Sequence, residues 1–258
     1  MEDQQWSAKA RAWDAVGSMF WELGRKSARP SQSEVEMFLT PILPAGPQAR
    51  IAVIGASTRD LVLGAAKIGK VSVFDFSSRM CSDLAAELEV QGVSAVSVFR
   101  LDITKSIPSE QRGQFDLVVS DRLINRLTED ECLLALHGMS ELLAPGGEIR
   151  TSVKLGLYPM DEKMLVMAGR AGIASNFFDS VTNTIDYAKA GELLESCIVA
   201  HGDIPRDSLL QWYRGRGKEK RYSADDVVRI SEAAVVPSRL IEWVELPDAP
   251  STRLYILR

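Results

Sequence analysis

The amino-acid sequence predicts an α/β fold, in which a mostly parallel, seven-stranded sheet carries helices on both faces. Residues 49–75 read as strand, tight turn, helix and strand, and both strands are near-continuous apolar runs. Such runs are typical of parallel strands that helices bury on both faces. Three early strands end in an acid, at Asp75, Asp102 and Asp121. Because the carboxyl ends of parallel strands meet at one edge, these acids predict a ligand-binding edge.

The first strand–helix–strand unit predicts a nucleoside site. Its first strand stops at Gly55, and the small residues Ala56 and Ser57 follow, so a ligand could approach the backbone closely. Of the glycine pattern G-x-G-x-x-G only Gly55 remains. Asp75 ends the second strand, where an acidic residue accepts hydrogen bonds from ribose hydroxyls.

The remaining strands and helices follow in alternation. A helix is expected to begin at Ser77 or Ser78 and to end at Gly92, and another to span residues 129–143 with Thr128 as its N-cap. A turn at 144–147 leads into the fifth strand. Further strands are expected at residues 96–101, 115–121, 148–153, 241–246 and 252–257.

The N-terminal residues 1–48 are expected to form a helical cap. Apolar residues from Trp6 to Phe20 recur at helical spacing, and Ser31 with Glu34 matches a capping box that starts a second helix. Two interpretations stay open. The helices could simply cover an edge of the sheet, or Trp13, Phe20 and Trp21 could form a lid that excludes water from the pocket.

Composition and charge exclude several classes of protein. A net charge of −5 disfavours nucleic acid as a partner, because phosphate binding needs a basic surface. The three cysteines and two histidines lack metal-ligand spacing, so no metal site is expected. No signal peptide or membrane-length apolar segment is found. We therefore expect a cytoplasmic protein with reduced thiols and no membrane partner.

The segment 154–235 is expected to hold insertions on the substrate side of the sheet. It contains helical patterns at 160–171, 188–197 and 224–234, with a basic, aromatic stretch at 211–223. The cations of this stretch, among them Arg214 and Arg216, are typical of a solvated loop. Alternatively, Arg214 and Arg216 could bind a phosphate or carboxylate on a substrate.

Together these motifs resemble a class I S-adenosylmethionine-dependent methyltransferase, with a Rossmann-like domain over residues 49–258. VFDFSSRM, RLDI and FDLVVSDRLINRL resemble the second, third and fourth motifs of that family, and LLAPGGEIR resembles the turn before its fifth strand. The first loop, which reads VIGASTR, is closer to a divergent bacterial branch. Trp13 and the segment 29–31 (RPS) echo features of that branch.

The resemblance implies S-adenosylmethionine as the cofactor and assigns roles to individual residues. Asp75 would bind the ribose hydroxyls, Phe76 and Met80 would lie near the adenine, and Asp102 would bind its amino group. Asp121 and Asn125 match positions of the fourth motif. The cofactor-binding residues are expected to be Gly55, Ala56, Ser57, Asp75, Phe76, Met80, Asp102, Ile103, Asp121 and Arg122.

One position departs from the family pattern. Val53 stands where the family carries an acid that orients the methionine end of the cofactor. Valine cannot accept or donate a hydrogen bond through its side chain. Either Asp60 or an N-terminal arginine replaces that acid, or cofactor affinity is reduced.

The sequence raises three possible functions. Methyl transfer to a small molecule needs an aligned nucleophile and, for some acceptors, a base, for which His201, Asp121 and Tyr158 are the candidates. Trp13, Trp21, Arg214 and Arg216 are the candidate substrate-binding residues. A short-chain reductase is excluded because no tyrosine has lysine four residues later. A regulatory or cyclase-like S-adenosylmethionine-binding protein that does not methylate stays open, as does a homodimer.

Overall fold

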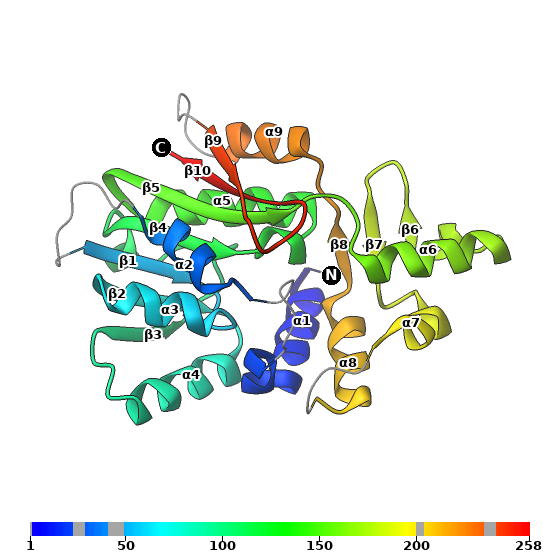
Figure 1. The fold of residues 1–258 in the computed structure, drawn as a ribbon, viewed down its shortest axis with the longest axis horizontal. Helices are drawn as coiled ribbons and strands as arrows, with labels where there is room; N and C mark the ends of the chain where they lie inside the picture. The colour runs from blue at the N-terminus through cyan, green and yellow to red at the C-terminus, as the bar shows by residue number, and fades with distance from the viewer. Residues whose placement is uncertain (1, 23–28, 41–48, 200–203, 235–240) are drawn as a thin grey trace.

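A seven-stranded mixed sheet lies at the centre of the computed structural model, which describes residues 2–22, 29–40, 49–199, 204–234 and 241–258 (Figure 1). The order across the sheet is β3-β2-β1-β4-β5-β10-β9, and β10 runs antiparallel to both of its neighbours. The predicted seven-stranded, mostly parallel sheet is therefore confirmed. Its strands are β1 Ala49–Ile54, β2 Gly69–Asp75, β3 Val96–Arg100, β4 Phe115–Asp121, β5 Leu143–Lys154, β9 Ile241–Glu245 and β10 Thr252–Leu257.

The strand register agrees with the predicted ligand-binding edge. In β1, Val53 lies opposite Val73 of β2 and Val119 of β4, so these three strands end side by side. The predicted turn at 144–147 is wrong in detail, because these residues belong to β5. The pairing of β4 with β5 shifts between Phe115 and Leu117, and this irregularity accommodates Gly146 at φ +81°.

Helices cover both faces of the sheet, as predicted. On one face, α2 (Gln32–Leu39), α3 (Arg59–Ala66) and α4 (Ser78–Val90) bury Phe38, Leu61 and Leu84 against the strands. On the other face, α5 (Glu129–Leu142) and α9 (Ala224–Ala234) bury Leu136 and Ile230. Short 3₁₀-helices follow at η2 Ser109–Gln111 and η3 Ile124–Arg126.

Helix starts lie at the polar residues that the sequence indicates. Ser31 and Thr128 each form a complete capping box, with Glu34 and Glu131 respectively. Ser77, rather than Ser78, caps α4, and its hydroxyl accepts the Met80 N–H at 3.1 Å. These caps satisfy backbone N–H groups that would otherwise lack partners at the helix N-termini.

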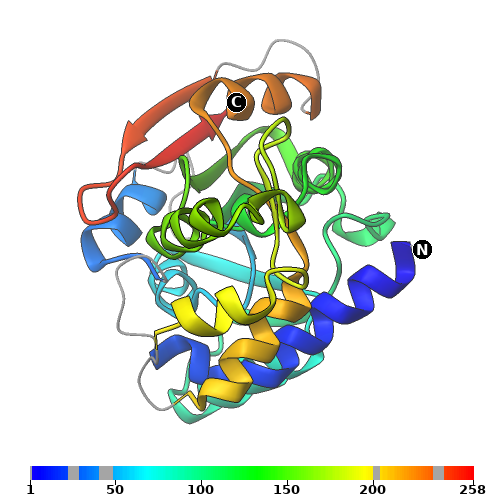
Figure 2. The same cartoon turned by 90° about the vertical axis from the view of Figure 1, so that its right-hand side faces the viewer.

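The N-terminal cap divides into two parts. The helix α1 (Glu2–Val16) and the 3₁₀-helix η1 (Gly17–Glu22) lie beyond the sheet edge, where α1 runs alongside α8 (Arg206–Arg216) (Figure 2). Gly215 permits this close approach, because a Cβ there would lie 2.7 Å from the Ala12 Cβ. In contrast, α2 packs on the face of the sheet. The interpretation that the cap covers the sheet holds for α2, whereas the lid formed by Trp13, Phe20 and Trp21 stays a prediction.

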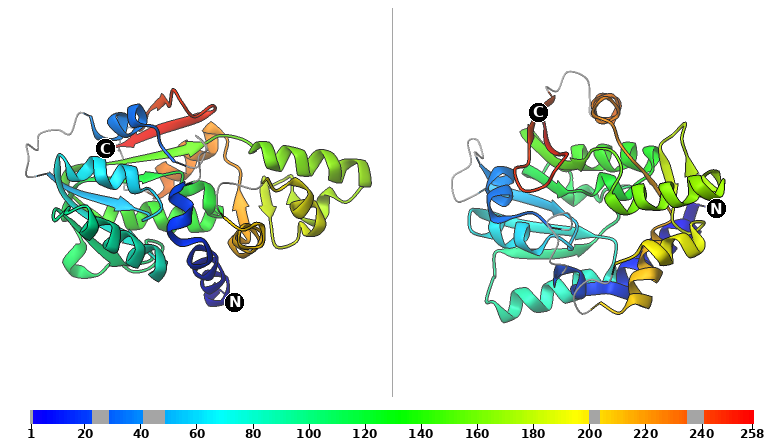
Figure 3. Two further views of the ribbon diagram at one scale, coloured as in Figure 1. Left: turned by 60° about the horizontal axis from the view of Figure 1, so that its bottom comes forward. Right: turned by 45° about the vertical axis from the view of Figure 1, so that its right-hand side comes forward.

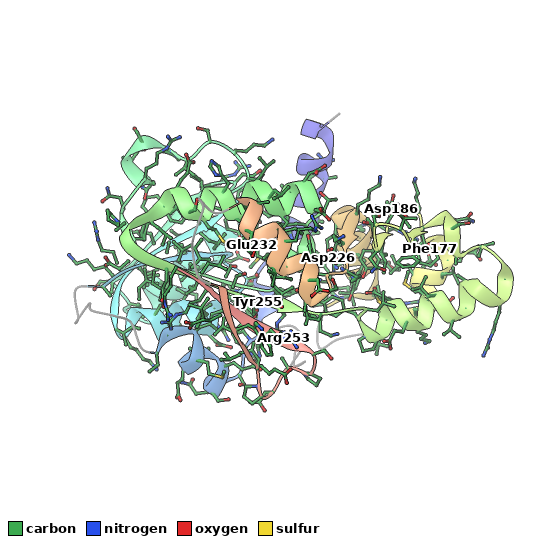
Figure 4. The ribbon with its side chains drawn as sticks, turned by 90° about the horizontal axis from the view of Figure 1, so that it is seen from above. Phe177, Asp186, Asp226, Glu232, Arg253 and Tyr255 are labelled. Atoms are coloured by element: carbon green, nitrogen blue, oxygen red, sulfur yellow. The ribbon has the colours of Figure 1, made fainter. Side chains whose placement is uncertain are left out.

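The segment between β5 and α9 builds a separate lobe that projects beyond the sheet (Figure 3). It has its own apolar cluster, in which Met164, Ile185 and Leu194 are fully buried. Phe177 and Asp186 lie in this lobe, far from Tyr255 and Arg253 on β10 (Figure 4). Its elements are α6 Pro159–Ala171, η4 Ala174–Asn176, β6 Phe178–Asp179, β7 Thr184–Asp186, α7 Gly191–Cys197 and β8 Lys218–Lys220.

The lobe differs from the sequence-based expectation in two ways. The sequence did not indicate the three-stranded antiparallel sheet β6-β7-β8, because two- and three-residue strands are too short for alternation to show. The basic stretch at 211–223 is not a solvated loop. It forms the end of α8 and β8, and Arg216 and Arg221 are buried in it. Among the described residues no helix has the length and apolar composition that a membrane crossing requires.

Two glycines offer a matched test of packing. A Cβ on Gly138 in α5 would lie 2.1 Å from the Ile103 carbonyl oxygen, whereas a Cβ on Gly169 in α6 would meet no atom within 4 Å. We expect Gly138→Ala to lower the free energy of unfolding by about 3 kcal/mol through overpacking. Gly169→Ala should raise it by about 1 kcal/mol through helix propensity. Urea unfolding of both variants measures the difference, and equal effects would contradict the packing seen here.

Candidate functional site

A pocket opens at the carboxyl ends of β1, β2 and β4, beneath α1 and beside the end of α8. Strand ends and the loops after them supply its floor, and the N-terminal cap supplies its roof. It is lined by Lys9, Trp13, Phe20, Ile54, Gly55, Ser57, Thr58, Asp75, Phe76, Asp121, Arg122, Leu123, Arg126, Leu127 and Arg216.

Asp75 ties two loops together on the floor of the pocket. One of its carboxylate oxygens accepts the Ala56 N–H and the other accepts the Ser77 N–H, each at 2.7 Å. Burial raises the pKa of Asp75 to about 6, although these two hydrogen bonds favour the charged form. Each oxygen keeps further lone-pair capacity, so the carboxylate can accept hydroxyl groups from a ligand.

Gly55 provides the open part of the floor. Its φ of +109° is readily available only to glycine, and a Cβ there would meet nothing closer than the Ser57 hydroxyl at 3.8 Å. The next peptide is held from both sides. The Ala56 N–H donates to Asp75, and the Ala56 carbonyl accepts Trp21 Nε1–H at 3.1 Å.

Asp121 and Arg122 form a buried, strained pair at the end of β4. Asp121 Oδ1 accepts the Ser152 hydroxyl at 2.5 Å and Arg122 Nε–H at 3.1 Å. Arg122 adopts φ +53°, which is uncommon outside glycine, and its backbone N–H donates to the Ser152 carbonyl. Such strain persists only where surrounding contacts enforce it, as at ligand sites.

Asn125 connects the ends of β4 and β5. Its side-chain amide donates to the Lys154 carbonyl and accepts the Lys154 N–H, both at 2.8 Å. This pair of bonds replaces the strand pairing that ends just before it. The next residue, Arg126, is thereby presented to the pocket.

An aromatic wall closes the pocket on the cap side. Trp13 packs edge-on against Phe20 with centroids 4.9 Å apart and against Trp212 of α8 at 5.3 Å. Asp14 fixes α1 in place by accepting the Ser77 hydroxyl at 2.6 Å. The cap is therefore attached both to α8 and to the start of α4, and Trp13 and Phe20 line the pocket on this side.

Lys9, Arg126 and Arg216 add cations to the pocket lining. Lys9 donates to Glu131 at 2.6 Å and to the Arg126 carbonyl at 3.2 Å. Arg216 makes two parallel hydrogen bonds to Glu219, both at 2.6 Å, and stacks on Trp212 with the guanidinium carbon 4.3 Å from the ring centre. The lining thus combines two carboxylates, aromatic rings and guanidinium groups.

The sequence-predicted residues divide between the pocket and its surroundings. Gly55, Ser57, Asp75, Phe76, Asp121 and Arg122 line it, with Trp13 and Arg216 from the candidate substrate-binding set. His201 lies outside the described residues. Among the described residues, the following are not in the lining: Ala56, Met80, Asp102, Ile103, Trp21, Arg214 and Tyr158.

Several of these outer residues support the site instead. Met80 is fully buried in the first turn of α4, and Asp102 Oδ1 accepts both the N–H and the hydroxyl of Thr104. Arg214 pairs with Glu195 on the surface of α8. Sequence reasoning missed Lys9, Thr58, Arg126 and Leu127, although Arg126 lies in the quoted stretch FDLVVSDRLINRL.

The departure at Val53 has a packing explanation. Val53 is fully buried in the apolar cluster that contains Trp21 and Leu61, so an acid would be desolvated there. Asp60 does not take over that role here, because its 39% exposed side chain faces Arg29 and Arg59 at 3.9 and 4.0 Å and is not part of the lining. Asp121 is the carboxylate at this end of β1 and β4 that does line the pocket.

Comparison with protein families matches residues 51–147 to the methyltransferase domain. This range contains Gly55, Asp75 and Asp121, which meet at the pocket. Among curated proteins none matches the chain.

Solved structures share the fold over most of the chain. A Rhodobacter sphaeroides protein, provisionally named a zinc-dependent alcohol dehydrogenase, is 43% identical with a TM-score of 0.90, covering 97% of this chain and 98% of its own. The CcbJ methyltransferase from Streptomyces caelestis is 13% identical with a TM-score of 0.62, covering 96% and 97%. An S-adenosylmethionine-dependent methyltransferase from Aquifex aeolicus is 14% identical with a TM-score of 0.50, covering 87% and 88%.

The dehydrogenase name has no counterpart among the described side chains of this chain. No group of three or more His, Cys, Asp or Glu residues in the described ranges is arranged to hold a metal ion.

Proposed function

Because residues 51–147 match the methyltransferase domain and solved methyltransferases share the fold, we propose that the chain is a class I S-adenosylmethionine-dependent methyltransferase that transfers a methyl group to a small-molecule acceptor. The observation that carries this proposal is the placement of Asp75. It ends the second strand of the sheet, lines the pocket, and keeps acceptor capacity on both carboxylate oxygens. Ribose hydroxyls are the donors that such a carboxylate binds in nucleoside sites.

The side chains of the pocket lining support this choice of cofactor. Asp75 would accept the ribose hydroxyls, Phe76 would pack near the adenine, and Gly55 leaves room for the ligand to pass close to the backbone. Met80, Asp102 and Ile103 would support the adenine end from outside the lining. When bound, the sulfonium of S-adenosylmethionine supplies an electrophilic methyl group.

The chain's own contribution to the reaction is positioning and exclusion of water. Trp13 and Phe20 cover the pocket, and the acceptor would enter between them and the residues after β4. Holding two reactants in line accounts for a large share of the acceleration in such a transfer. Asp121 is the candidate base that lines the pocket, and Ser152 and Arg122 orient it by the two hydrogen bonds to Oδ1.

Calorimetry tests the proposal directly. The protein should bind both S-adenosylmethionine and S-adenosylhomocysteine with one site per chain, and 5′-methylthioadenosine more weakly because it lacks the amino-acid part. Release of S-adenosylhomocysteine in the presence of a small-molecule panel then reports turnover. Absence of heat with either full-length ligand would defeat the proposal. Binding without turnover on any acceptor would favour the alternative of a non-methylating binding protein.

The free cysteines and the net charge support a cytoplasmic enzyme that acts on a small molecule. Cys81, Cys132 and Cys197 are free thiols, which is typical of a reducing cytoplasmic compartment. The net charge of −5 supports a small molecule rather than nucleic acid as the acceptor.

A further inference from the structure

We infer that the acceptor carries a single carboxylate, which Arg126 and Arg216 bind in the pocket that Asp75 also lines. This inference rests on the proposed function and names the class of its substrate. The two guanidinium groups come from distant segments, one just after β4 and one at the end of α8. Both line the same pocket, and both approach the carboxylate of Glu219.

Charge in this cluster is not balanced by the protein itself. Arg126, Arg216 and Arg221 surround Glu219, with nearest nitrogen–oxygen distances of 3.8, 2.6 and 3.1 Å. Arg221 also pairs with buried Asp161 at 2.6 Å. Three guanidinium groups therefore face two carboxylates, which leaves one positive charge. A singly charged anion would neutralise it, whereas a phosphate dianion would exceed it.

Three buried polar atoms around the arginines lack partners. Arg216 Nη1, Trp212 Nε1 and the Tyr158 hydroxyl have no hydrogen bond to any described residue. Arg126 lies between the two rings, with its guanidinium carbon 5.7 Å from the Tyr158 centroid and 5.8 Å from that of Trp212. Buried donors of this kind nearly always have a partner. Of these three residues Arg216 belongs to the pocket lining, so a ligand with acceptor oxygens is expected beside its Nη1.

Apolar side chains line the pocket together with these arginines. Trp13, Phe20, Leu123 and Leu127 line it, so the carboxylate is expected on a flat, apolar body such as an aromatic ring. We assign the carboxylate an anchoring role rather than that of the methyl-accepting atom, because two guanidinium groups withdraw charge from its oxygens and weaken them as nucleophiles.

The methionine carboxylate of the cofactor is the other source of the same chemistry. The methionine end carries an ammonium group beside its carboxylate, so it would not neutralise the positive charge left among Arg126, Arg216 and Arg221. This charge balance favours an acceptor with a single carboxylate as the source. The two sources predict different effects on cofactor binding, and a variant separates them.

The experiment uses the protein loaded with S-adenosylhomocysteine and three matched pairs of probes. These are benzoate, 3-phenylpropionate and indole-3-acetate, each compared with its neutral amide by calorimetry. We expect at least one carboxylate to bind about tenfold or more tightly than its amide, as charge-assisted hydrogen bonds allow. In Arg126→Gln the ratio of the affinity for the carboxylate to that for its amide should fall to about one. Arg214→Gln is the control, because it removes a cation from the same helix as Arg216 on the exposed surface, and it should keep the preference.

Cofactor binding distinguishes the remaining outcomes. Arg126→Gln should bind S-adenosylhomocysteine and 5′-methylthioadenosine as the unmodified protein does, since Arg126 is 17% exposed and its replacement is tolerated more readily than that of Arg216. If only S-adenosylhomocysteine binding weakens, the arginines hold the cofactor carboxylate and the inference is wrong. If no carboxylate is preferred over its amide while S-adenosylhomocysteine binds normally, the inference fails and the proposed function stands. Failure to bind S-adenosylhomocysteine at all defeats the proposed function first.

Discussion

Replacing Asp75 with asparagine is expected to weaken S-adenosylhomocysteine binding about 100-fold, because hydrogen bonds to a charged acceptor are replaced by one amide oxygen and one amide donor. Asp75 accepts two backbone N–H groups and would accept two ribose hydroxyls as well. Calorimetry measures the affinity, and circular dichroism checks that the variant is folded. Asp60→Asn is the matched control, since its 39% exposed side chain lies in the helix after the same loop and outside the pocket lining.

The affinity should also depend on pH through Asp75. Burial raises its pKa to about 6, and a bound ligand that donates hydrogen bonds favours the charged form. Binding should therefore be tight above pH 6 and weaken by up to about tenfold per pH unit below it. For folding the sign is opposite, because a raised pKa means that the native state holds the proton longer. The ligand-free protein should lose stability from this group as pH rises from 3.8 to about 6. Identical pH profiles for the unmodified protein and Asp75→Asn would contradict this assignment.

Glu219→Gln is expected to lower the free energy of unfolding by about 4 kcal/mol, because removing one partner leaves buried guanidinium charges uncompensated. Glu219 is fully buried and is the shared carboxylate of Arg126, Arg216 and Arg221. Such a loss is a large fraction of the stability of an ordinary domain. Urea unfolding measures it. Glu245→Gln, which disrupts an exposed pair with Arg253, should change stability by less than about 0.5 kcal/mol.

Acid titration offers a second measurement of the same group. Burial alone would raise the pKa of Glu219, but the charges of Arg216, Arg126 and Arg221 outweigh burial and lower it to about 2. A lowered pKa stabilises the fold at pH values above 4.5, and this contribution is lost as pH falls from 4.5 to about 2. Glu219→Gln should lose this part of the acid transition. If the variant lost stability at acid pH just as the unmodified protein does, Glu219 would not carry the charge assigned to it.

The sequence was a good guide wherever local pattern sets structure. The apolar runs and the acids after them predicted the parallel strands and the edge at which Asp75 and Asp121 meet. Ser31, Ser77 and Thr128 marked helix starts because their hydroxyl groups satisfy nearby backbone N–H groups. These contacts span three residues, and a local pattern is sufficient to reveal them.

The structure of the basic stretch at residues 211–223 was predicted less well than the strands and helix starts. Arg214 and Arg216 looked equivalent in sequence, yet Arg214 pairs with Glu195 on the surface while Arg216 is buried against Glu219 and three aromatic rings. Two residues along a helix point to different sides, and which side is inside depends on where α8 docks. That docking is set by α1, more than 190 positions earlier in the chain.

The sequence alone determined the main sheet and the acids at its strand ends, because strand periodicity and the residues that follow each strand are local properties. Only the tertiary structure decided which cations join Asp75 and Asp121 in the pocket lining. Arg126 and Arg216 reach one cavity from two distant segments, and Glu219 and Asp161 supply two negative charges to the three guanidinium groups of Arg126, Arg216 and Arg221. Long-range packing, which no local pattern encodes, leaves these guanidinium groups with one positive charge and thereby points to the chemistry of the acceptor.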